Sequence, residues 1–132
     1  YDYISNRINP KYPDGLDVEI YSFKTLQMVE QNAKLSSERA LVTTYITKNP
    51  KIFKIFSYEN QEDLSGHRWT VDEQNDLEFV RKIYSIMKPK TNFSMNEIIE
   101  ILVKNPELLK INSGIVRNEG HLKLYDNDKV VK

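Results

Sequence analysis

The densest group of residues that could do chemistry is a set of carboxylates that begins at Asp72. Three further acids follow within the next six positions, and no basic residue lies between Asp72 and Val80. Asp72 stands where a predicted strand gives way to a predicted helix, the edge at which open α/β sheets bind ligands. Because Mg²⁺ is typically held by one or two carboxylates together with substrate phosphates, we predict that Asp72 is a metal ligand. The preference of a helix N-terminus for negative charge explains the acids that follow: Glu73, Asp76 and Glu78.

A second pair of acids, Asp17 and Glu19, lies on one face of a predicted strand. In the segment LDVEIYSF, apolar and polar residues alternate, so that Leu16, Val18 and Ile20 share the opposite face. This two-residue period is typical of a strand with one buried face. Two interpretations of the acidic face remain open: it binds a ligand, or it is the solvated face of an edge strand.

Two arginines are further candidates for contact with a substrate. Arg39 lies in the first turns of a predicted helix, where a cation needs an anionic partner. A bound anion could be that partner, but the sequence favours a salt bridge to Glu38 or to an acid elsewhere in the chain. Arg68 shares one face of a predicted strand with Asp72. Its neighbour Trp69 is either a core residue or a platform on which a base or sugar stacks.

The run Arg117-Asn118-Glu119-Gly120 is polar, and it forms either a substrate loop or a simple turn. The two histidines, His67 and His121, are too far apart in sequence to form a metal-binding motif. We therefore interpret them as ordinary surface or hydrogen-bonded residues. The sequence has no Gly-rich phosphate loop, no Ser nucleophile elbow and no HExxH motif.

Composition excludes several other kinds of protein. The 132 residues carry 19 Lys and Arg against 19 Asp and Glu, and this zero net charge argues against nucleic-acid binding. No apolar run approaches the roughly 20 residues that cross a membrane, so we expect no membrane contact. The absence of Cys excludes disulfides, thiolate metal sites and a Cys nucleophile. It also fits a reducing compartment, and we place the protein in the cytoplasm.

The elements that must position these residues follow from hydrophobic periodicity and capping signals. Strands are predicted at 16–23, 52–58 and 67–72, and the first residues look like the end of another strand. Helices are predicted from Ser22 to about Leu35, from Ser36 or Ser37 to Asn49, from the acids after Asp72 to Met87, and from Met95 to about Lys104. Ser94 and Glu97 have the spacing of a capping box. We expect one α/β or α+β domain at 1–125 and a flexible, frayed tail at 126–132.

Taken in order, the motifs resemble one family. The blocks PDGLDVEIYSF, SSERALVTTYI, RWTVDEQNDLEFVRKIY, NPELL and RNEG follow one another over nearly the whole chain. This order is similar to that of the cytidylyltransferase-like family named for spore coat polysaccharide biosynthesis, which is related to the CMP-sugar synthetases. The resemblance implies an α/β fold of the nucleotide-diphospho-sugar transferase type, a Rossmann-like three-layer α/β/α sheet. It also places the chain as the C-terminal half of that domain, because the family's Gly-rich nucleotide-binding loop and first metal-binding Asp have no counterpart here.

The resemblance implies a function as well. Such proteins transfer CMP from CTP to a sugar or sugar acid, for surface or spore-coat polysaccharide, in an Mg²⁺-dependent reaction that releases pyrophosphate. Asp72 matches the Asp that helps to hold Mg²⁺ in the related synthetases. The candidates for substrate contact are Asp17, Glu19, Arg39, Arg68, Arg117 and Asn118. Because half of a carboxylate pair does not build a metal site, we predict that the 132 residues alone are inactive.

Two departures from the family pattern keep a second hypothesis open. The family reads Arg-Glu-His-Val-Thr where this chain has residues 39–43, so Leu41 stands in place of His. The Pro that follows the family's metal-binding Asp-Glu is Gln74 here. The chain could therefore bind a different sugar, or it could be a non-catalytic sugar-binding or dimerisation module. A sheet without half of its strands leaves an exposed edge, and exposed edges pair, so we expect a homo-oligomer.

Overall fold

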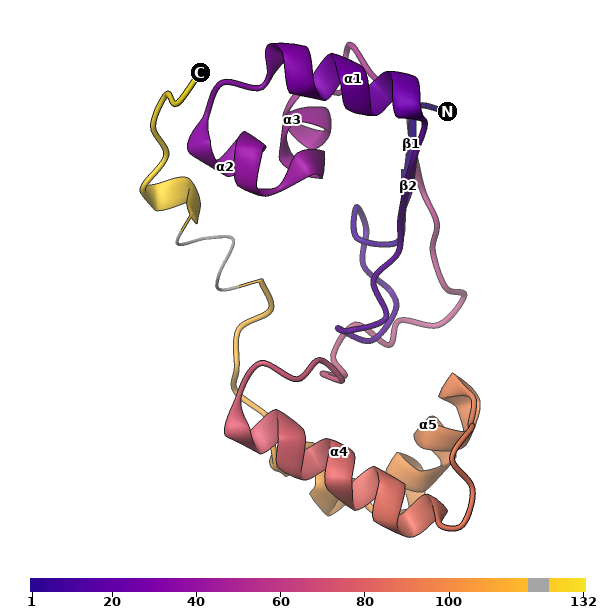
Figure 1. The fold of residues 1–132 in the computed structure, drawn as a ribbon. Coiled ribbons are helices and arrows are strands. Elements are labelled where there is room, and N and C mark those ends of the chain that lie inside the picture. The colour runs from indigo at the N-terminus through magenta and orange to yellow at the C-terminus, as the bar shows by residue number, and fades with distance from the viewer. Residues whose placement is uncertain (119–123) are drawn as a thin grey trace.

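A computed structural model describes residues 1–118 and 124–132 (Figure 1). A small sheet with helices α1, α2 and α3 forms one end of the molecule, and helices α4 and α5 form the other end. In chain order the elements are β1 Tyr3–Ser5, β2 Glu19–Tyr21, α1 Phe23–Asn32, α2 Ser36–Ala40, α3 Val42–Lys48, β3 Ile55–Ser57, α4 Gln74–Met87, α5 Met95–Lys104 and the 3₁₀ helix η1 Pro106–Lys110. The predicted mixture of strands and helices is therefore confirmed. Within the described ranges, no helix has the length and apolar character needed to span a membrane.

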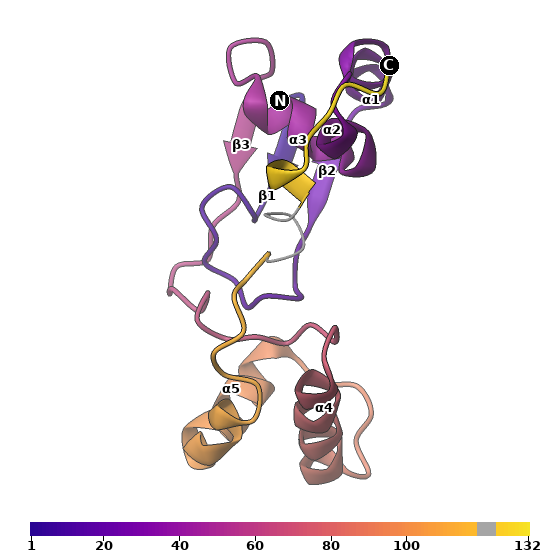
Figure 2. The same cartoon turned by 90° about the vertical axis from the view of Figure 1, so that its left-hand side faces the viewer.

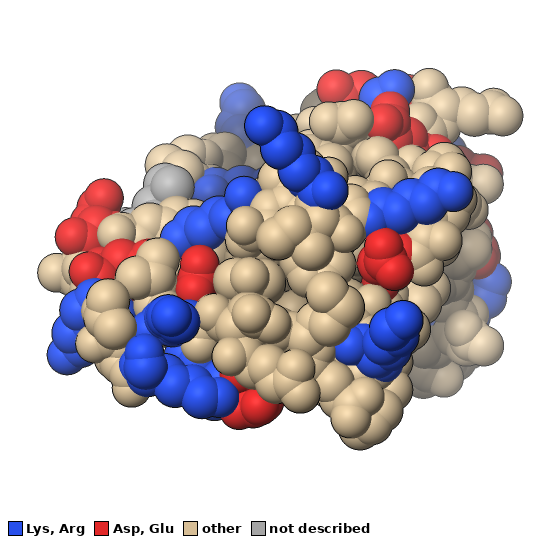
Figure 3. Space-filling view, turned by 90° about the horizontal axis from the view of Figure 1, so that it is seen from above, with Lys and Arg blue, Asp and Glu red and all other residues tan. Residues whose placement is uncertain are grey.

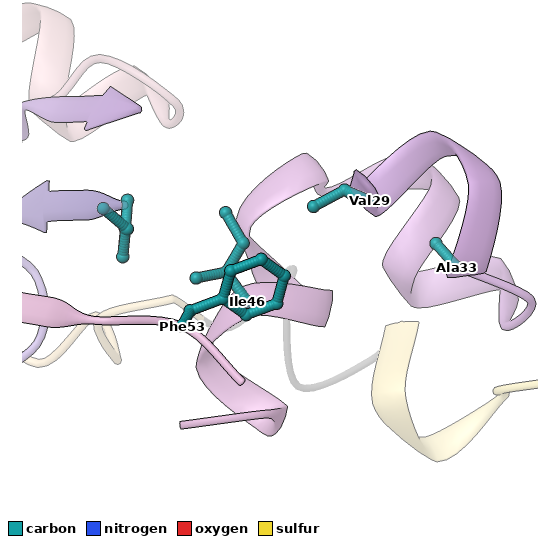
Figure 4. Packing of buried hydrophobic residues seen from close by; sticks show 5 residues of the cluster. Val29, Ala33, Ile46 and Phe53 are labelled. Carbon is teal, nitrogen blue, oxygen red and sulfur yellow. The ribbon is translucent and has the colours of Figure 1, made fainter. Parts of the chain in front are cut away.

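The sheet has the strand order β2-β1-β3, with β1 antiparallel to β2 and parallel to β3. Its central strand places Tyr3 opposite Tyr21 on one side and Ile55 on the other. Helices α1 and α3 pack against the sheet, and this core consists of Tyr3, Val29, Ala33, Ile46 and Phe53 (Figure 4). The apolar face predicted for 16–23 does not join this core, because Val18 and Ile20 are exposed.

The second core lies at the other end of the molecule, between α4, α5 and η1 (Figure 2). Its buried residues are Phe79, Ile83, Leu102 and Leu108. Trp69 packs against this core, which favours the core interpretation of its side chain. The capping box predicted for α5 is confirmed, because Ser94 accepts a hydrogen bond from the Glu97 amide and the Glu97 carboxylate accepts one from the Ser94 amide.

The helix predicted between Ser36 or Ser37 and Asn49 is divided in two. It breaks at Leu41, which is extended (φ −121°, ψ 94°) and separates α2 from α3. The N-cap of α2 is Leu35 rather than a serine. The orphan amides at this helix start instead donate to the Glu38 carboxylate, which accepts from the backbone of Lys34 and Leu35. The break turns α3 so that Leu41 and the threonines that follow it line a pocket beside the sheet.

The strand predicted at 67–72 is wrong. This segment forms only an isolated bridge between Arg68 and Asp14, in which the Asp14 amide donates to the His67 carbonyl and the Trp69 amide donates to the Asp14 carbonyl. Gly15 permits this close approach, since its φ of 102° favours glycine and a Cβ would lie 2.6 Å from the Thr70 amide nitrogen. The segment thus joins the two cores instead of extending the sheet.

Residues 126–132, which we predicted to be a flexible tail, contact helices α1 and α2 in the structure. Asp128 accepts hydrogen bonds from both serines that open α2, and Lys132 pairs with Glu30 of α1. The backbone of this segment also pairs with α2, through a bridge between Leu35 and Val130. Sequence polarity suggested a solvated tail, but the polar side chains bind specific partners on the helices.

Candidate functional site

The pocket beside the sheet has a volume of about 250 Å³ and is lined by residues from four separate parts of the chain. The strands β1 and β2 supply Tyr3 and Glu19, and the start of α3 supplies a wall of threonines. Asn118 and Tyr125 come from the C-terminal part of the sequence. This pocket brings together two of the predicted substrate contacts, Glu19 and Asn118.

The carboxylate of Glu19 is the polar centre of the pocket. Its Oε1 accepts hydrogen bonds from the Tyr3 hydroxyl at 2.5 Å, from Thr43 Oγ1 at 2.8 Å and from Arg7 Nη1 at 3.1 Å. Burial, followed by the hydrogen bond to Glu19, raises the pKa of Tyr3 to about 12, so its phenol stays a donor. All these contacts fall on one oxygen, and no described residue donates to Oε2. Glu19 can therefore accept a hydrogen bond from a ligand hydroxyl.

Arg7 connects this carboxylate to the rest of the site. Its guanidinium lies 3.6 Å from Asp17 and donates to Asn118 Oδ1 at 3.4 Å. Asn118 adopts a φ of 60°, a conformation that asparagine tolerates better than most residues. Of the acidic face predicted for 16–23, Glu19 thus lines the pocket, and Asp17 lies beside it as a partner of Arg7. Contact of either acid with a substrate stays a prediction.

Arg117 fixes Asp17 from the other side. Its Nη2 donates to Asp17 Oδ1 at 2.8 Å, its Nη1 donates to the Tyr12 carbonyl at 3.3 Å, and its Nε lies 3.6 Å from Asp14. Arg117 therefore holds Asp17 beside the pocket, and its predicted contact with substrate stays a prediction. The remainder of the predicted polar run, Glu119 and Gly120, lies outside the described residues, as does His121.

Arg68 is the centre of a second, closed cluster of charges. It donates two hydrogen bonds to Asp76, at 2.8 and 2.9 Å, and reaches Asp14 at 3.2 Å and Asp72 at 3.3 Å. Asn112 also donates to Asp76, whose side chain is fully buried. Burial alone raises the pKa of Asp76, but the hydrogen bonds from Arg68, from Asn112 and from backbone amides hold it far below its usual range.

These contacts occupy the Arg68 guanidinium, and its predicted contact with substrate stays a prediction. Its side chain is only 12% exposed, and three carboxylates surround its guanidinium. Hydrogen bonds to Asp76 raise its pKa further. Asp76 also accepts from the backbone amides of Asp72 and Glu73, so it caps α4 as well as pairing with the arginine. Arg68 thus ties the start of α4 to the Asp14 turn.

Asp72, the predicted metal ligand, is the exposed member of this cluster. Its side chain is 67% exposed, and its Oδ2 accepts from Arg68 and from Thr70. Among residues 1–118 and 124–132, no group of three or more ligating side chains is placed to hold a metal ion. Asp72 therefore fits one position in a magnesium site, as an accessible anionic oxygen ligand, but the chain's described residues do not complete the coordination sphere.

Arg39 lies apart from both clusters. It donates to the Glu30 carbonyl and forms a salt bridge with the Glu30 carboxylate at 3.5 Å. The salt-bridge interpretation is thus the one that the structure supports, with an acid from α1 as the partner.

His67 is half-buried, and burial lowers its pKa. On the face seen in Figure 3, acidic and basic side chains are interspersed.

Several residues that line the pocket were not predicted from the sequence, among them Arg7, Tyr3 and Thr43. Arg7 lies in a turn with no periodic pattern, and nothing at its position indicates that it meets Asp17 and Glu19. Tyr3 reads as an ordinary strand aromatic, and its hydroxyl contact depends on the pairing of β1 with β2. A useful signal was the Arg39–Thr43 segment, since Leu41 and Thr43 both line the pocket.

No family model matches the chain. The sequence is 33% identical over 120 residues to an uncharacterised protein of Methanocaldococcus jannaschii, a match that covers 87% of this chain and 46% of that protein. The structure is similar to that of a cytidylyltransferase from Leptospira borgpetersenii serovar Hardjo-bovis, with a TM-score of 0.79 and 29% identity over 87% of this chain and 48% of that one. The chain spans about half the length of the relatives it matches.

The structural match supports the resemblance drawn from the sequence. The mixed α/β arrangement with a small three-stranded sheet is similar to part of a cytidylyltransferase, and the likeness covers most of the chain. The sequence identity of 29% shows that the two proteins are similar in amino-acid sequence as well as in backbone fold. This chain is accordingly similar to cytidylyltransferases, a class of nucleotidyltransferases.

Proposed function

We propose that this chain is part of a nucleotidyltransferase that activates a sugar or sugar acid with CTP, for surface or spore-coat polysaccharide. The observation that carries the proposal is the pocket around Glu19, in a chain similar in fold and sequence to a cytidylyltransferase. The pocket presents carboxylate, guanidinium, amide and hydroxyl groups, the chemistry that recognises a ring with several hydroxyls. In this proposal the chain supplies the sugar site and one metal ligand.

The reaction that follows from the proposal is in-line attack of a sugar hydroxyl on the α-phosphate of CTP. A sugar oxygen–phosphorus bond forms, the bond to pyrophosphate breaks, and the hydroxyl proton is released. Nucleotidyl transfer needs positioning and charge neutralisation more than covalent assistance. Glu19 orients the sugar by accepting from a ring hydroxyl, while Arg7 and Asn118 fix the position of Glu19 and the pocket wall. Mg²⁺, with Asp72 as one ligand, would neutralise charge on the phosphates.

The test is release of pyrophosphate from CTP in the presence of candidate sugars. The 132-residue chain should show no turnover, because one carboxylate does not complete a metal site. A polypeptide of the relatives' length that contains this chain should show Mg²⁺-dependent turnover, and Asp72→Asn should reduce it by at least about a hundredfold. The control is Glu78→Gln, which changes an acid of α4 outside the Arg68 cluster. Turnover by the 132 residues alone would contradict the prediction for the isolated chain.

The alternative is a non-catalytic module that binds sugar or pairs with another copy. The replacement of the family's His by Leu41 favours this alternative, because Leu41 lines the pocket. A His that contacts substrate in the family would be missing here. The same Asp72→Asn experiment separates the two functions, since a binding module has no Mg²⁺-dependent activity to lose.

We also propose that the chain forms a homo-oligomer. Exposed apolar side chains on the sheet support this, among them Val18, Ile20 and Tyr58. Sedimentation velocity should show a species larger than a 15.6 kDa monomer. A monomer at high protein concentration would contradict the proposal.

A further inference from the structure

Residues 124–132, which we call the strap, run along the helices that flank the pocket. In Figures 1 and 2 this segment, drawn in yellow, lies beside α1 and α2. Its backbone pairs with the residues that lead into α2. The Ser36 amide donates to the Lys129 carbonyl at 2.8 Å, and the Val131 amide donates to the Lys34 carbonyl at the same distance. The strap therefore has a defined position on the helices.

Asp128 fastens the strap to the start of α2. Its Oδ1 accepts from Ser36 Oγ at 3.0 Å and from the Ser37 amide at 2.9 Å, and its Oδ2 accepts from Ser37 Oγ at 2.7 Å. Lys48 of α3 donates to the same Oδ2 at 3.2 Å. Hydrogen bonds from the Ser37 amide and hydroxyl hold the pKa of Asp128 far below its usual range, so the carboxylate is charged at neutral pH. One side chain thus ties the strap to both α2 and α3.

The fastened strap places Tyr125 at the pocket. The Asp128 amide donates to the Tyr125 carbonyl at 3.3 Å, which fixes the two residues within one turn of the strap. Lys48 Nζ lies 5.4 Å from the centroid of the Tyr125 ring, so the cation that pairs with Asp128 also packs over this ring. Tyr125 lines the pocket together with Leu41 and the threonines of α3, and its side chain is exposed. An exposed aromatic face beside polar groups can bury the apolar face of a pyranose ring.

We propose that Tyr125 contacts the substrate by stacking on a sugar ring in the pocket, and that Asp128 is the positioning residue that holds Tyr125 there. This inference rests on the proposed function, because it concerns how the same pocket holds a sugar. A ring that is held in place before the ligand arrives needs no ordering at the moment of binding, and this increases affinity.

The first test measures the fastening without a ligand. Asp128→Asn keeps the shape of the side chain but removes its charge, and hydrogen bonds to charged groups are the stronger kind. Amide hydrogen exchange at Ser36 and Val131, which pair across the strap, should therefore become at least about tenfold faster. The matched control is Asp126→Asn, which changes an exposed acid of the strap and should leave both rates unchanged. Unchanged rates in Asp128→Asn would overturn the role of Asp128.

The position of the Tyr125 ring can be followed in the same samples. A ring that lies over Lys48 shifts the resonances of the Lys48 side chain upfield, and Tyr125→Leu supplies the reference without this shift. In Asp128→Asn the Lys48 resonances should move toward those of the Tyr125→Leu reference. Resonances that stay at their original positions would show that the ring does not depend on Asp128, and would overturn the positioning role.

The second test measures binding. Three pyranosides are titrated into the ¹⁵N-labelled chain: methyl β-D-glucopyranoside, methyl β-D-galactopyranoside and methyl β-D-glucopyranosiduronate. The amide shifts of Thr43 and Thr44 report occupation of the pocket. For a pyranoside that binds, Tyr125→Leu should weaken binding about two- to tenfold, the size of an aromatic contact. Asp128→Asn should have a similar effect. The double variant should bind no more weakly than Tyr125→Leu, because Asp128 acts through Tyr125.

The outcomes separate this inference from the proposed function. Equal affinities of the unaltered chain and Tyr125→Leu overturn the stacking contact and leave the nucleotidyltransferase intact. Additive losses in the double variant overturn the positioning role of Asp128. If none of the three pyranosides shifts the pocket amides, the inference is overturned together with the sugar site on which it rests. Pyrophosphate release from CTP in the longer polypeptide remains a separate measure of the nucleotidyltransferase itself.

Discussion

The molecule contains two clusters of arginines and carboxylates, and they differ in how completely their charges are enclosed. In the Arg68 cluster, Arg68 is 12% exposed and Asp76 is fully buried, with its hydrogen bonds supplied from within the chain. In the pocket, Arg7 and Glu19 are 22% and 28% exposed, and no residue of 1–118 or 124–132 donates to Oε2 of Glu19. The two clusters share Asp14, through Arg68 on one side and Arg117 on the other.

The difference shows how the same residue types serve two purposes. A buried pair whose hydrogen bonds are complete has nothing left to offer a ligand, and breaking it leaves an uncompensated charge. A partly exposed pair costs the fold little and keeps acceptor capacity for a substrate. Apart from the exposed Asp72, the Arg68 cluster should therefore govern stability, and the pocket should govern binding.

The largest effect should come from Arg68→Ala. Removal of the guanidinium leaves Asp76 and Asp14 without their cation, and we expect a loss of about 3–5 kcal/mol in the free energy of unfolding. Arg68→Lys should cost less, because it retains the charge but not the forked hydrogen bonds. The control is Arg39→Ala, an exposed salt bridge, which should cost about 0.5 kcal/mol or less. Urea denaturation measures all three, and equal midpoints for Arg68→Ala and Arg39→Ala would contradict the comparison.

Acid should remove the stability that the Arg68 cluster provides. The unfolded Asp76 carboxyl takes up a proton near pH 4, whereas the folded one resists protonation, so stability falls as the pH decreases below about 4. Asp76→Asn should cost about 2 kcal/mol at pH 7, the worth of hydrogen bonds to a charged group. It should also flatten the decline between pH 5 and pH 2. Glu97, whose pKa the hydrogen bond from Lys90 lowers to about 2, should keep a residual acid dependence in this variant.

An intermediate effect is expected from Arg117, the residue between the two clusters. Arg117→Ala should cost about 1 kcal/mol, since its ion pairs are partly exposed. Because Asp17 contacts both arginines, Arg117 should help to fix the position of Arg7. A double-mutant cycle of Arg117→Ala with Arg7→Ala should then give a coupling energy of at least about 0.5 kcal/mol. The matched cycle with Arg39→Ala should be additive. Additivity in both cycles would mean that Arg117 is not coupled to Arg7, and would contradict the prediction.

Some elements could be predicted from local sequence, and others depended on tertiary contacts. Ser22 and Ser94 were placed correctly as helix caps, because a capping hydrogen bond spans only three residues. The strand at 67–72 could not be judged in the same way. Its alternation is real, but the partner of its backbone is the Asp14 turn rather than a sheet strand.

In the candidate site, too, some features could be predicted from local sequence and others depended on tertiary contacts. Residue type and strand period placed Asp17 and Glu19 on one face. In the structure Glu19 lines the pocket, and Asp17 contacts Arg7 beside it. The sequence could not show that Arg7 and Asn118 meet there, since 111 positions separate them. It also could not separate Arg68 from Arg7, because whether an arginine is enclosed by acids depends on how distant segments pack.

The smallest effect on stability, and the sharpest measure of the pocket, should come from Glu19→Gln. Because the pair with Arg7 is partly exposed, we expect a change of less than about 1 kcal/mol in the free energy of unfolding. The pKa of Tyr3, which is about 12, should nevertheless fall, since the Glu19 hydrogen bond and charge raise it. It should stay above 10, because burial is the larger cause and persists in the variant. Titration of the ¹³Cζ resonance of Tyr3, assigned with Tyr3→Phe, measures the shift. An unchanged Tyr3 pKa would mean that the phenol does not sense Glu19, and the pocket would then lack the polar centre that distinguishes it from the Arg68 cluster.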